Sequence, residues 1–559
     1  MSETSQRISL IEASGLQSLF PVLTADQIAR IAAHGRPRHA EKDEILAQAG
    51  ELTARFFVVI SGEIEIVAVA SPTQELIAVV RPGMFTGEAS MLSGRRGFAQ
   101  LIAVEPSEVI EVERENLLGL VQTDSELSDI LMRAFILRRV ELIERHLGDV
   151  VLVGSVHCGG TIRIKEFLTR NGHPYSFIDL DNDDQAQDLL DRFRVSTADV
   201  PVLICRGEVV LRNPSNEEIA DCLGFNDAID QAHLRDLVIV GAGPSGLAAA
   251  VYGASEGLDV LVIESNSPGG QAGSSSKIEN YLGFPTGITG AELAGRAYTQ
   301  AQKFGAELLI ARGAKQLACE RKPYAVTIDT GPRLATRSII IATGAEYRKL
   351  ALPNLSQFEN AGIYYGATFI ESQLCSGEEV IVVGGGNSAG QAAVFLSQTC
   401  KRVYVLIRAE CLAKTMSRYL IRRIEGSPTI DLRPRTEIAA LDGNHHLERV
   451  TWRDNQTGQT ETHNIRHVFV MAGAVPNTHW LEGCVALDAK GFIKTGPDLS
   501  PEELEAAKWP LSRLPHLLET SLPGVFAVGD ARRGSVKRVA SAVGEGSIAV
   551  AFVHQVLAE

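Results

Sequence analysis

The spacing of hydrophobic and polar positions changes along the chain. Up to about residue 148, short runs alternate apolar and polar side chains, as in Phe56–Ile60, Glu63–Val67 and Glu108–Val112. Glycine and proline separate these runs, a pattern typical of a small antiparallel barrel or sandwich. Between Ser125 and about Leu147 the apolar positions follow a period near 3.6, which predicts a helix. We therefore expect residues 1–148 to form a β-roll with helices.

The next segment, residues 149–226, alternates short apolar runs with helical patterns. This alternation predicts a compact α/β unit. The predicted strands are Val150–Val153, Ser176–Leu180 and Val202–Cys205, and the predicted helices are Thr161–Arg170 and Asp184–Phe193. The junction to the rest of the chain is expected between Phe225 and Leu234.

The remaining residues contain the same pattern twice: an apolar strand, a glycine-rich loop and a helix. One unit begins at Asp236 and the other at Glu378. This duplication predicts two Rossmann-like α/β domains. The whole chain is thus expected to be multidomain.

Composition narrows the class of protein. The 559 residues are 45% hydrophobic and 22% charged, with a formal net charge of -15, which disfavours a nucleic-acid partner. No secretory signal and no unbroken apolar run of membrane-spanning length is visible, so we expect a cytoplasmic protein without a membrane contact. The eight cysteines contain no Cys-x-x-Cys pair, and their scatter predicts neither a metal site nor a disulfide framework.

The first glycine unit has the features of a dinucleotide site. The strand Leu237–Val240 precedes Gly241-Ala242-Gly243-Pro244-Ser245-Gly246, and Glu264 ends the next strand. The glycines permit a tight turn and close approach of a pyrophosphate, and the helix N-terminus attracts its charge. A carboxylate about 20 residues on is suited to ribose hydroxyls. An ordinary glycine turn is the simpler alternative.

The second glycine unit differs at the acid position. The strand Val380–Val383 precedes Gly384-Gly385-Gly386-Asn387-Ser388-Ala389, and the acid position falls at Ile407, followed by Arg408. An arginine can pair with a 2′-phosphate that a carboxylate would repel, which favours NADPH over NADH. Lys414 and Arg418 are further candidates for phosphate contacts, or else part of a solvated basic face.

Residues 235–559 resemble the low-molecular-weight thioredoxin reductases, within the pyridine nucleotide–disulfide oxidoreductases. The resemblance rests on these two units and on further motifs in the same order: Gly269-Gly270-Gln271, Lys277–Tyr281 with Asn280, Ala342-Thr343-Gly344, Gly473–Thr478 and Val525–Asp530. It implies FAD at the first unit, NADPH at the second and a homodimer, with residues 234–348 and 477–559 forming the FAD domain and residues 349–476 the NADPH domain. It also implies flavin-side roles for Gly270, Gln271, Asn280, Thr343, Gly344, Gly529, Asp530 and Arg538.

The chain departs from that family where the active disulfide is expected. The Cys-Ala-Thr-Cys box of thioredoxin reductases is replaced here by Gly366-Ala367-Thr368-Phe369. Cys375 is nearby, but we interpret it as a small buried residue because one cysteine cannot form the pair. Reduced flavin therefore has no dithiol at this position to receive its electrons, so the ordinary thioredoxin reductase mechanism cannot operate in this protein without a change.

The middle unit supplies a candidate substitute. His157-Cys158-Gly159-Gly160-Thr161 opens a helix and resembles the active segment of a glutaredoxin or thioredoxin fold. The resemblance places Cys158 at the nucleophilic position, Thr161 at the resolving position and Pro201 at the cis-proline. A thiol at a helix N-terminus can be activated. Cys158 is thus a candidate catalytic residue, with Cys222 as a candidate resolving partner, and a docking module is the alternative.

Residues 16–147 resemble a cyclic-nucleotide-binding domain. The cassette that binds the phosphate in that family corresponds to Gly87-Glu88-Ala89 through Ala99. Glu88 falls at the ribose-binding acid, whereas Arg95 and Arg96 are displaced from the phosphate-binding arginine. The candidate ligand residues are therefore Gly87, Glu88, Arg95 and Arg96, and the alternative is a domain kept for regulation or packing.

Together these features predict an FAD- and NADPH-dependent oxidoreductase. Its electron acceptor is expected to be a small molecule or a protein, either a disulfide reached through Cys158 or a quinone, ferredoxin, flavodoxin or oxygen. The second hypothesis is a ligand-gated sensor whose redox half reports the state of NADPH. Residues 497–516, with a predicted helix Pro501–Lys508, form an insertion relative to compact thioredoxin reductases.

Overall fold

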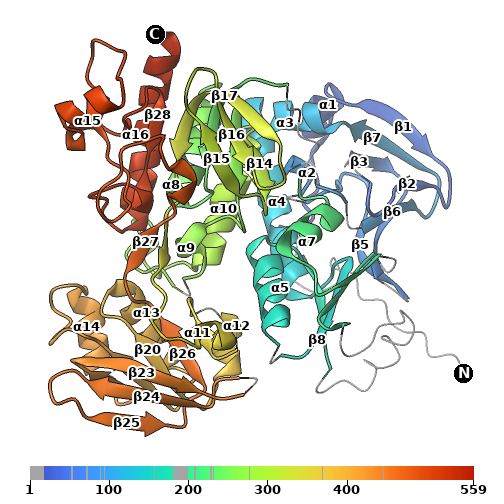
Figure 1. The fold of residues 1–559 in the computed structure, drawn as a ribbon. Helices are drawn as coiled ribbons and strands as arrows, with labels where there is room; N and C mark the ends of the chain where they lie inside the picture. Colours follow the sequence, from blue (N-terminus) through green and yellow to red (C-terminus); the bar gives the residue numbers. More distant parts are fainter. Residues whose placement is uncertain are drawn as a thin grey trace, which may run out of the picture.

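The protein folds into four packed units, and the second dinucleotide unit is inserted in the sequence of the first (Figure 1). The computed structural model describes residues 18–51, 55–70, 73–88, 90–93, 95–97, 99–156, 158–180, 199–206, 209–226, 230, 232–275, 277–359, 361–367, 369–444 and 446–559. The multidomain α/β and β-roll architecture expected from the sequence is confirmed.

The N-terminal unit is a β-roll with helices, coloured blue in Figure 1. Its strands form two antiparallel sheets, ordered β1-β7-β3 and β2-β6-β4-β5. Phe56 of β3, Phe85 and Phe135 of α4 pack with ring centroids 5.6–6.2 Å apart, which fixes the long helix to the roll. The elements are α1 (Ala25–Ala32), β1 (Arg36–Ala40), β2 (Ile45–Ala47), β3 (Phe56–Ser61), β4 (Ile64–Ala70), β5 (Thr73–Val80), α2 (Ser90–Ser93), β6 (Ala99–Ala103), β7 (Ser107–Val112), α3 (Arg114–Thr123) and α4 (Ser125–Glu144).

The middle unit is a four-stranded sheet ordered β11-β10-β8-β9, with β8 and β9 parallel. Its elements are β8 (Val150–Gly154), α5 (Gly159–Arg170), β9 (Ser176–Asp179), β10 (Val202–Cys205), β11 (Val209–Arg212) and α7 (Asn216–Leu223). β11 and α7 were not expected from the sequence, although the capping box between Ser215 and Glu218 marks the start of α7. The predicted helix Asp184–Phe193 lies outside the described residues.

The first dinucleotide domain has a parallel sheet extended by antiparallel strands, in the order β14-β13-β12-β17-β16-β15, with β28 beside β17. Helices α8, α10 and α16 contribute to the core on one face. The elements are β12 (Arg235–Val240), α8 (Pro244–Ser255), β13 (Val260–Glu264), α9 (Gly270–Gly273), α10 (Gly290–Lys303), β14 (Glu307–Ile310), β15 (Ala314–Ala318), β16 (Tyr324–Ile328), β17 (Arg333–Ile341), η2 (His479–Leu481), η3 (Gly496–Asp498), α15 (Pro501–Ala506), β28 (Val525–Ala527), η4 (Gly529–Ala531) and α16 (Val539–Ala558).

The second dinucleotide domain has a five-stranded parallel sheet, ordered β19-β26-β20-β21-β22, and a separate antiparallel sheet of β23, β24 and β25. Two short strands, β18 and β27, pair where the chain crosses between the dinucleotide domains. The elements are β18 (Ala345–Tyr347), α11 (Leu355–Phe358), β19 (Ile363–Tyr364), α12 (Phe369–Leu374), β20 (Glu379–Val383), α13 (Asn387–Leu396), β21 (Arg402–Leu406), α14 (Arg418–Glu425), β22 (Ile430–Arg433), β23 (Thr436–Asp442), β24 (Arg449–Asp454), β25 (Thr460–His463), β26 (His467–Val470) and β27 (Ala474–Pro476).

The sequence led us to expect no segment long and apolar enough to cross a membrane, but helix α16 meets both criteria. Within the described part of the chain, it is the one helix whose length and composition would allow it to cross a membrane. It packs along α8 instead: Ala549, Val550 and Val553 belong to the core of the first dinucleotide domain, and His554 pairs with Glu256 of the α8 C-cap at 2.9 Å. Its apolar composition therefore serves this packing in the structure.

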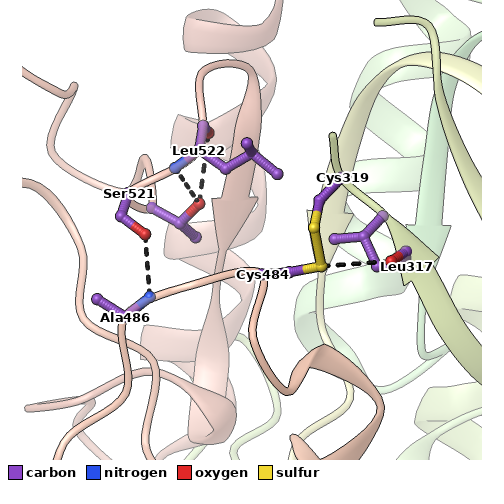
Figure 2. The surroundings of a disulfide bond; sticks show 7 residues. Leu317, Cys319, Cys484, Ala486, Ser521 and Leu522 are labelled. Carbon is purple, nitrogen blue, oxygen red and sulfur yellow. Dashed lines mark hydrogen bonds between the residues drawn. A yellow bond between two sulfur atoms is a disulfide. The ribbon is translucent and has the colours of Figure 1, made fainter. Parts of the chain in front are cut away.

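The sequence predicts no disulfide framework, and the structure contains one disulfide that the sequence did not indicate. Cys319, just after β15, is bonded to Cys484, just after η2, although 165 residues separate them (Figure 2). Beside this bond, the backbone amide of Ala486 donates to the Ser521 hydroxyl at 2.9 Å. The sequence gives no hint of this pairing because the two segments meet only through the folded sheet.

Candidate functional site

The first glycine loop lies between β12 and α8, as the sequence predicts. Gly243 is the N-cap residue of α8 and Pro244 occupies the first turn, where its missing N–H costs nothing. A Cβ at Gly246 would lie 1.8 Å from the carbonyl oxygen of Gly241, so only glycine permits this approach of helix to strand. Ser245 is buried in the same turn. The N-terminus of α8 thus lies at the end of the glycine loop, a geometry suited to the predicted pyrophosphate.

Glu264 lies at the end of β13 beside this loop. Its two carboxylate oxygens accept hydrogen bonds from the backbone amides of Ala242 and Asn266, at 2.8 and 2.9 Å. Burial raises the pKa of Glu264, and these backbone donors oppose the rise. Each oxygen keeps a lone pair for a ribose hydroxyl, so the geometry suits the predicted role.

The other predicted flavin-side residues gather around the crossing between domains. Gln271 donates to the carbonyl of Ala345 on β18, and the Thr343 hydroxyl donates to the carbonyl of Asn477 at 2.8 Å. Gly270 begins α9, Gly344 has a φ of 64°, and Asn280 is exposed. These contacts place the loops of three distant segments beside the first glycine loop.

Asp530 lies in η4, directly before α16. Burial raises the pKa of Asp530, while the ammonium of Lys537, 3.8 Å away, lowers it. The neighbouring Gly529 amide donates to Glu545 of α16 at 2.7 Å, and Arg538 is the N-cap residue of that helix. The N-terminus of α16 is therefore fixed next to Asp530, as the closing motif predicts.

The second glycine loop lies between β20 and α13. Gly384 has a φ of 142°, and a Cβ there would lie 2.5 Å from the carbonyl oxygen of Met471. Gly386 is the N-cap residue and Asn387 opens the helix. The segment before α14 covers the loop, because Thr415 donates to the carbonyl of Gly385 and the amide of Ser417 donates to Asn387, both at 2.7 Å.

Side chains around this second loop follow the predicted charge pattern. Ile407, at the acid position, is 2% exposed in the core, whereas Arg408 is exposed. Lys414 and Arg418, which follow Arg408 in the sequence, are also exposed. Ser388 hydrogen-bonds Tyr347 of β18, while Ala389 is buried.

The box that lacks cysteines lies against the first dinucleotide domain. Ala367 forms a parallel bridge with Ser275, and a Cβ at Gly366 would lie 3.7 Å from that of Ser274. Thr368 lies outside the described residues. Cys375 is buried as expected, but it is not alone: its sulfur lies 3.6 Å from that of Cys400.

Cys158 occupies the predicted position in the thioredoxin-like unit. It is the N-cap residue of α5 and is half-buried. The Val200–Pro201 peptide bond is cis, and a Cβ at Gly160 would lie 3.0 Å from the Pro201 ring. Arg163 of α5 donates to Asn216 and to the carbonyl of Pro214, at 2.7 and 2.6 Å, and Thr161 is fully buried. His157 lies outside the described residues.

Cys222 does not pair with Cys158. Its thiol hydrogen-bonds that of Cys205, the last residue of β10. Cys158 lies at the opposite end of β10, beside Pro201. Four residues of extended strand separate these ends by roughly 13 Å. The structure therefore overturns the suggestion that Cys222 resolves Cys158.

The middle unit is docked on the first dinucleotide domain by polar contacts. Arg170 of α5 donates to the carbonyl of Gly270 at 2.8 Å, and Asn216 of α7 donates to Asn266 at 2.9 Å. Asn226 makes two hydrogen bonds to the backbone of Ile310, at 2.7 and 2.9 Å. The thioredoxin-like unit is thus packed next to the first glycine site.

In the N-terminal unit, Gly87, Glu88 and Arg96, which were predicted to bind a cyclic nucleotide, contact α4 and the segment around Gly50. Glu88 pairs with Arg139 of α4 at 3.2 Å, and the Gly87 carbonyl accepts from Arg138 at 2.7 Å. Arg96 donates to the carbonyl of Gly50 at 3.2 Å. Ala89 lies outside the described residues.

Arg95 reaches out of its own domain. It is 4% exposed and donates to the carbonyl of Asn171 at 3.1 Å and to the Tyr298 hydroxyl of α10 at 2.9 Å. Its guanidinium also lies 4.1 Å from the Phe225 ring centroid. This side chain therefore joins three units.

Two α/β units with glycine loops at the carboxyl ends of their first strands define a two-dinucleotide oxidoreductase. Residues 235–546 match the model of the pyridine nucleotide-disulphide oxidoreductases, and residues 37–124 match that of the cyclic nucleotide-binding domain. The chain belongs to the pyridine nucleotide-disulphide oxidoreductase family.

Curated relatives and solved structures agree. The chain is 30% identical to the thioredoxin reductase of Bacillus subtilis over 331 residues, covering 59% of this chain and 97% of that protein. It is 32% identical to the enzyme of Ureaplasma parvum over 323 residues, covering 57% and 96%. The crystal structure of Lactococcus lactis thioredoxin reductase (FR conformation) matches with a TM-score of 0.51 and 25% identity, covering 58% of this chain and 99% of that one. The protein is an oxidoreductase of the thioredoxin reductase class.

Proposed function

We propose that this protein binds FAD at the first glycine loop and NADPH at the second, and passes hydride from NADPH to FAD. The observation that carries the proposal is the contrast between the loops: Glu264 beside the first, Ile407 and exposed Arg408 beside the second. When bound, NADPH supplies a hydride and FAD accepts it, so the protein contributes binding and orientation.

The residues of the two sites have distinct roles in this proposal. The backbone amides at the N-termini of α8 and α13 hold the two pyrophosphates, Glu264 binds the FAD ribose, and Arg408 binds the 2′-phosphate of NADPH. The remaining contacts to FAD come from Gly270, Gln271, Asn280, Thr343, Gly344, Gly529, Asp530 and Arg538.

We assign residues 234–348 and 477–559 to the FAD domain and residues 349–476 to the NADPH domain. Within the part of the chain the structure describes, β18 and β27 pair at the crossing and Ser275 bridges Ala367 beside it, and this short crossing suits a hinge. Residues 1–148 and 149–226 are the two preceding domains. A homodimer and a cytoplasmic location remain predictions, which sedimentation and cell fractionation test.

An anaerobic titration tests the cofactor assignment. The purified holoprotein should be yellow, and about one equivalent of NADPH per flavin should bleach it, whereas NADH should bleach it more slowly. A flavin that NADPH fails to reduce, or a protein that purifies without flavin, would overturn the proposal.

We further propose that the acceptor is a disulfide reached through Cys158. Its half-exposed position as the N-cap residue of α5 supports a thiol that the disulfide of a substrate can reach. Cys158→Ser should abolish reduction of glutathione disulfide or oxidised thioredoxin while NADPH still bleaches the flavin. Cys411→Ser, at an exposed cysteine, is the control. Unchanged disulfide reduction by Cys158→Ser would contradict the proposed route through Cys158.

A second candidate acceptor needs no cysteine. Gly366 and Ala367 lie against Ser274 and Ser275 of the FAD domain and carry no thiol, which supports transfer from the flavin to a quinone, ferredoxin, flavodoxin or oxygen without a cysteine. A screen of these acceptors with Cys158→Ser separates the two routes, because only the disulfide route loses activity.

The N-terminal domain is proposed to regulate the redox half. Arg95 is engaged by Asn171 and Tyr298, so a cyclic nucleotide that recruited it would have to break contacts between domains. Flavin reduction measured with and without cyclic AMP tests this. A nucleotide-dependent rate combined with slow turnover favours the sensor hypothesis, and no change favours a packing role.

A further inference from the structure

Two buried cysteines face each other in the NADPH domain. Cys375 follows α12 and Cys400 precedes β21, and their sulfur atoms are 3.6 Å apart. Cys375 is fully buried and Cys400 is 5% exposed. The Cys400 sulfur also lies 3.4 Å from the carbonyl oxygen of Cys375. The two thiols therefore contact each other within the core.

The backbone holds the two cysteines in position. The amide of Gly377 donates to the carbonyl of Thr399 at 2.9 Å, and the amide of Lys401 donates to the carbonyl of Glu378 at 2.8 Å. Because these bonds flank both cysteines, rotation of the side chains can bring the sulfurs toward the ~2.05 Å of a disulfide with little backbone movement.

We propose that Cys375 and Cys400 form a reversible oxidation site that closes to a disulfide, with a hydroperoxide as oxidant. One thiolate attacks the O–O bond, which gives a sulfenic acid and releases hydroxide that takes up the thiol proton as water. The second thiol then attacks that sulfur, the S–S bond forms and a second water leaves. Two thiols and one hydrogen peroxide thus give one disulfide and two waters.

The neighbours of the pair indicate which sulfur reacts first. The hydrogen bond from Cys375 lowers the pKa of Cys400, while the same contact and burial raise the pKa of Cys375. Cys400 is also the more exposed of the two. Cys400 is therefore the attacking thiolate and Cys375 the resolving thiol.

The position of the pair gives the disulfide a structural consequence. The segment between the cysteines contains β20, the second glycine loop and α13. Closing it would enclose the NADPH-binding unit in a covalent ring and fix the end of α12, the helix that begins in the cysteine-free box. Since cross-linking restricts the unfolded chain, we expect oxidation to raise the melting temperature by about 5–10 °C.

Peptide mapping of the holoprotein tests the proposal directly. Residues 350–401 form one tryptic peptide with no internal lysine or arginine, and Cys375 and Cys400 are its only cysteines. After hydrogen peroxide, catalase and alkylation, this peptide should be two hydrogens lighter and unlabelled, and dithiothreitol should restore both labels. Cleavage after Glu378 or Glu379 should leave two segments joined by the disulfide.

Variants give the matched comparison. Cys375→Ala and Cys400→Ala should each leave the other thiol open to labelling and lose the rise in melting temperature, whereas Cys411→Ala should keep both effects. The proposal is overturned if both thiols of the wild-type peptide remain labelled under peroxide that oxidises Cys411, or if either is converted to sulfinic acid without a disulfide. The wild-type map decides the question even where a variant fails to fold.

Discussion

Cys222 shows how one neighbour changes the chemistry of a side chain. Its thiol is half-buried and accepts a hydrogen bond from Cys205, which lowers the pKa of Cys222 to about 7, with help from the Arg206 guanidinium. Cys205 keeps its proton because that bond and burial raise its pKa. The thiolate of Cys222 therefore prevails above about pH 7.

Alkylation rates test this pKa. The rate of iodoacetamide labelling at Cys222 should rise about tenfold between pH 6 and pH 8, as its thiolate fraction rises. Cys205→Ala removes the hydrogen bond and should move the midpoint upward, toward the ~8.5 of a free cysteine. Mass spectrometry measures the labelling, with Cys411 followed in the same samples, and an unchanged midpoint in Cys205→Ala would contradict the assignment.

Arg408 is the residue that we expect to make the protein prefer NADPH over NADH. Arg408→Ala should raise the KM for NADPH by about 10- to 100-fold, since a charge-assisted hydrogen bond to phosphate is lost, and should leave the KM for NADH unchanged. Stopped-flow reduction of the flavin by each cofactor measures both. Arg402→Ala, at the other end of β21, is the matched control, and equal losses for both cofactors would contradict a 2′-phosphate contact.

At the scale of elements, the Cys319–Cys484 disulfide joins the end of β15 to the segment after η2. Both cysteines pack against the core of the first dinucleotide domain. Because the bond closes a loop of 165 residues, it removes many conformations from the unfolded chain.

Removing this bond should destabilise the protein. The double variant Cys319→Ser/Cys484→Ser should lower the free energy of unfolding by about 2–4 kcal/mol, and dithiothreitol should bring the wild type to the same value. Denaturant unfolding followed by circular dichroism measures it, with Cys411→Ser as the control. Identical curves for wild type and double variant would show that the bond contributes no stability.

At the scale of the whole molecule, Arg95 connects three domains. It contacts the carbonyl of Asn171 in the thioredoxin-like unit, the Tyr298 hydroxyl on α10 and the Phe225 ring. Since Asn171 is buried, losing Arg95 removes a donor from a buried carbonyl, which costs more than losing a surface contact.

A double-mutant cycle tests this connection. Arg95→Ala should speed limited proteolysis between the N-terminal domain and the rest, and Tyr298→Phe should cost about 1 kcal/mol for one hydrogen bond. The two effects should not add, with a coupling energy of about 0.5–3 kcal/mol. Arg133→Ala, at an exposed arginine of α4, is the control, and fully additive effects would contradict a direct contact.

The sequence by itself determined the two glycine loops, Glu264, Arg408 and the missing box cysteines, because a phosphate-binding loop and its strands are contiguous in the chain. It also determined the cis-proline and Cys158, since both belong to a local motif. Only the tertiary structure decided that Cys319 bonds to Cys484 and that Cys375 contacts Cys400. It also decided that Arg95 donates to Tyr298, which is 203 residues away in the sequence. Such contacts depend on which faces of distant elements pack together, and the local spacing of residues carries no record of that packing.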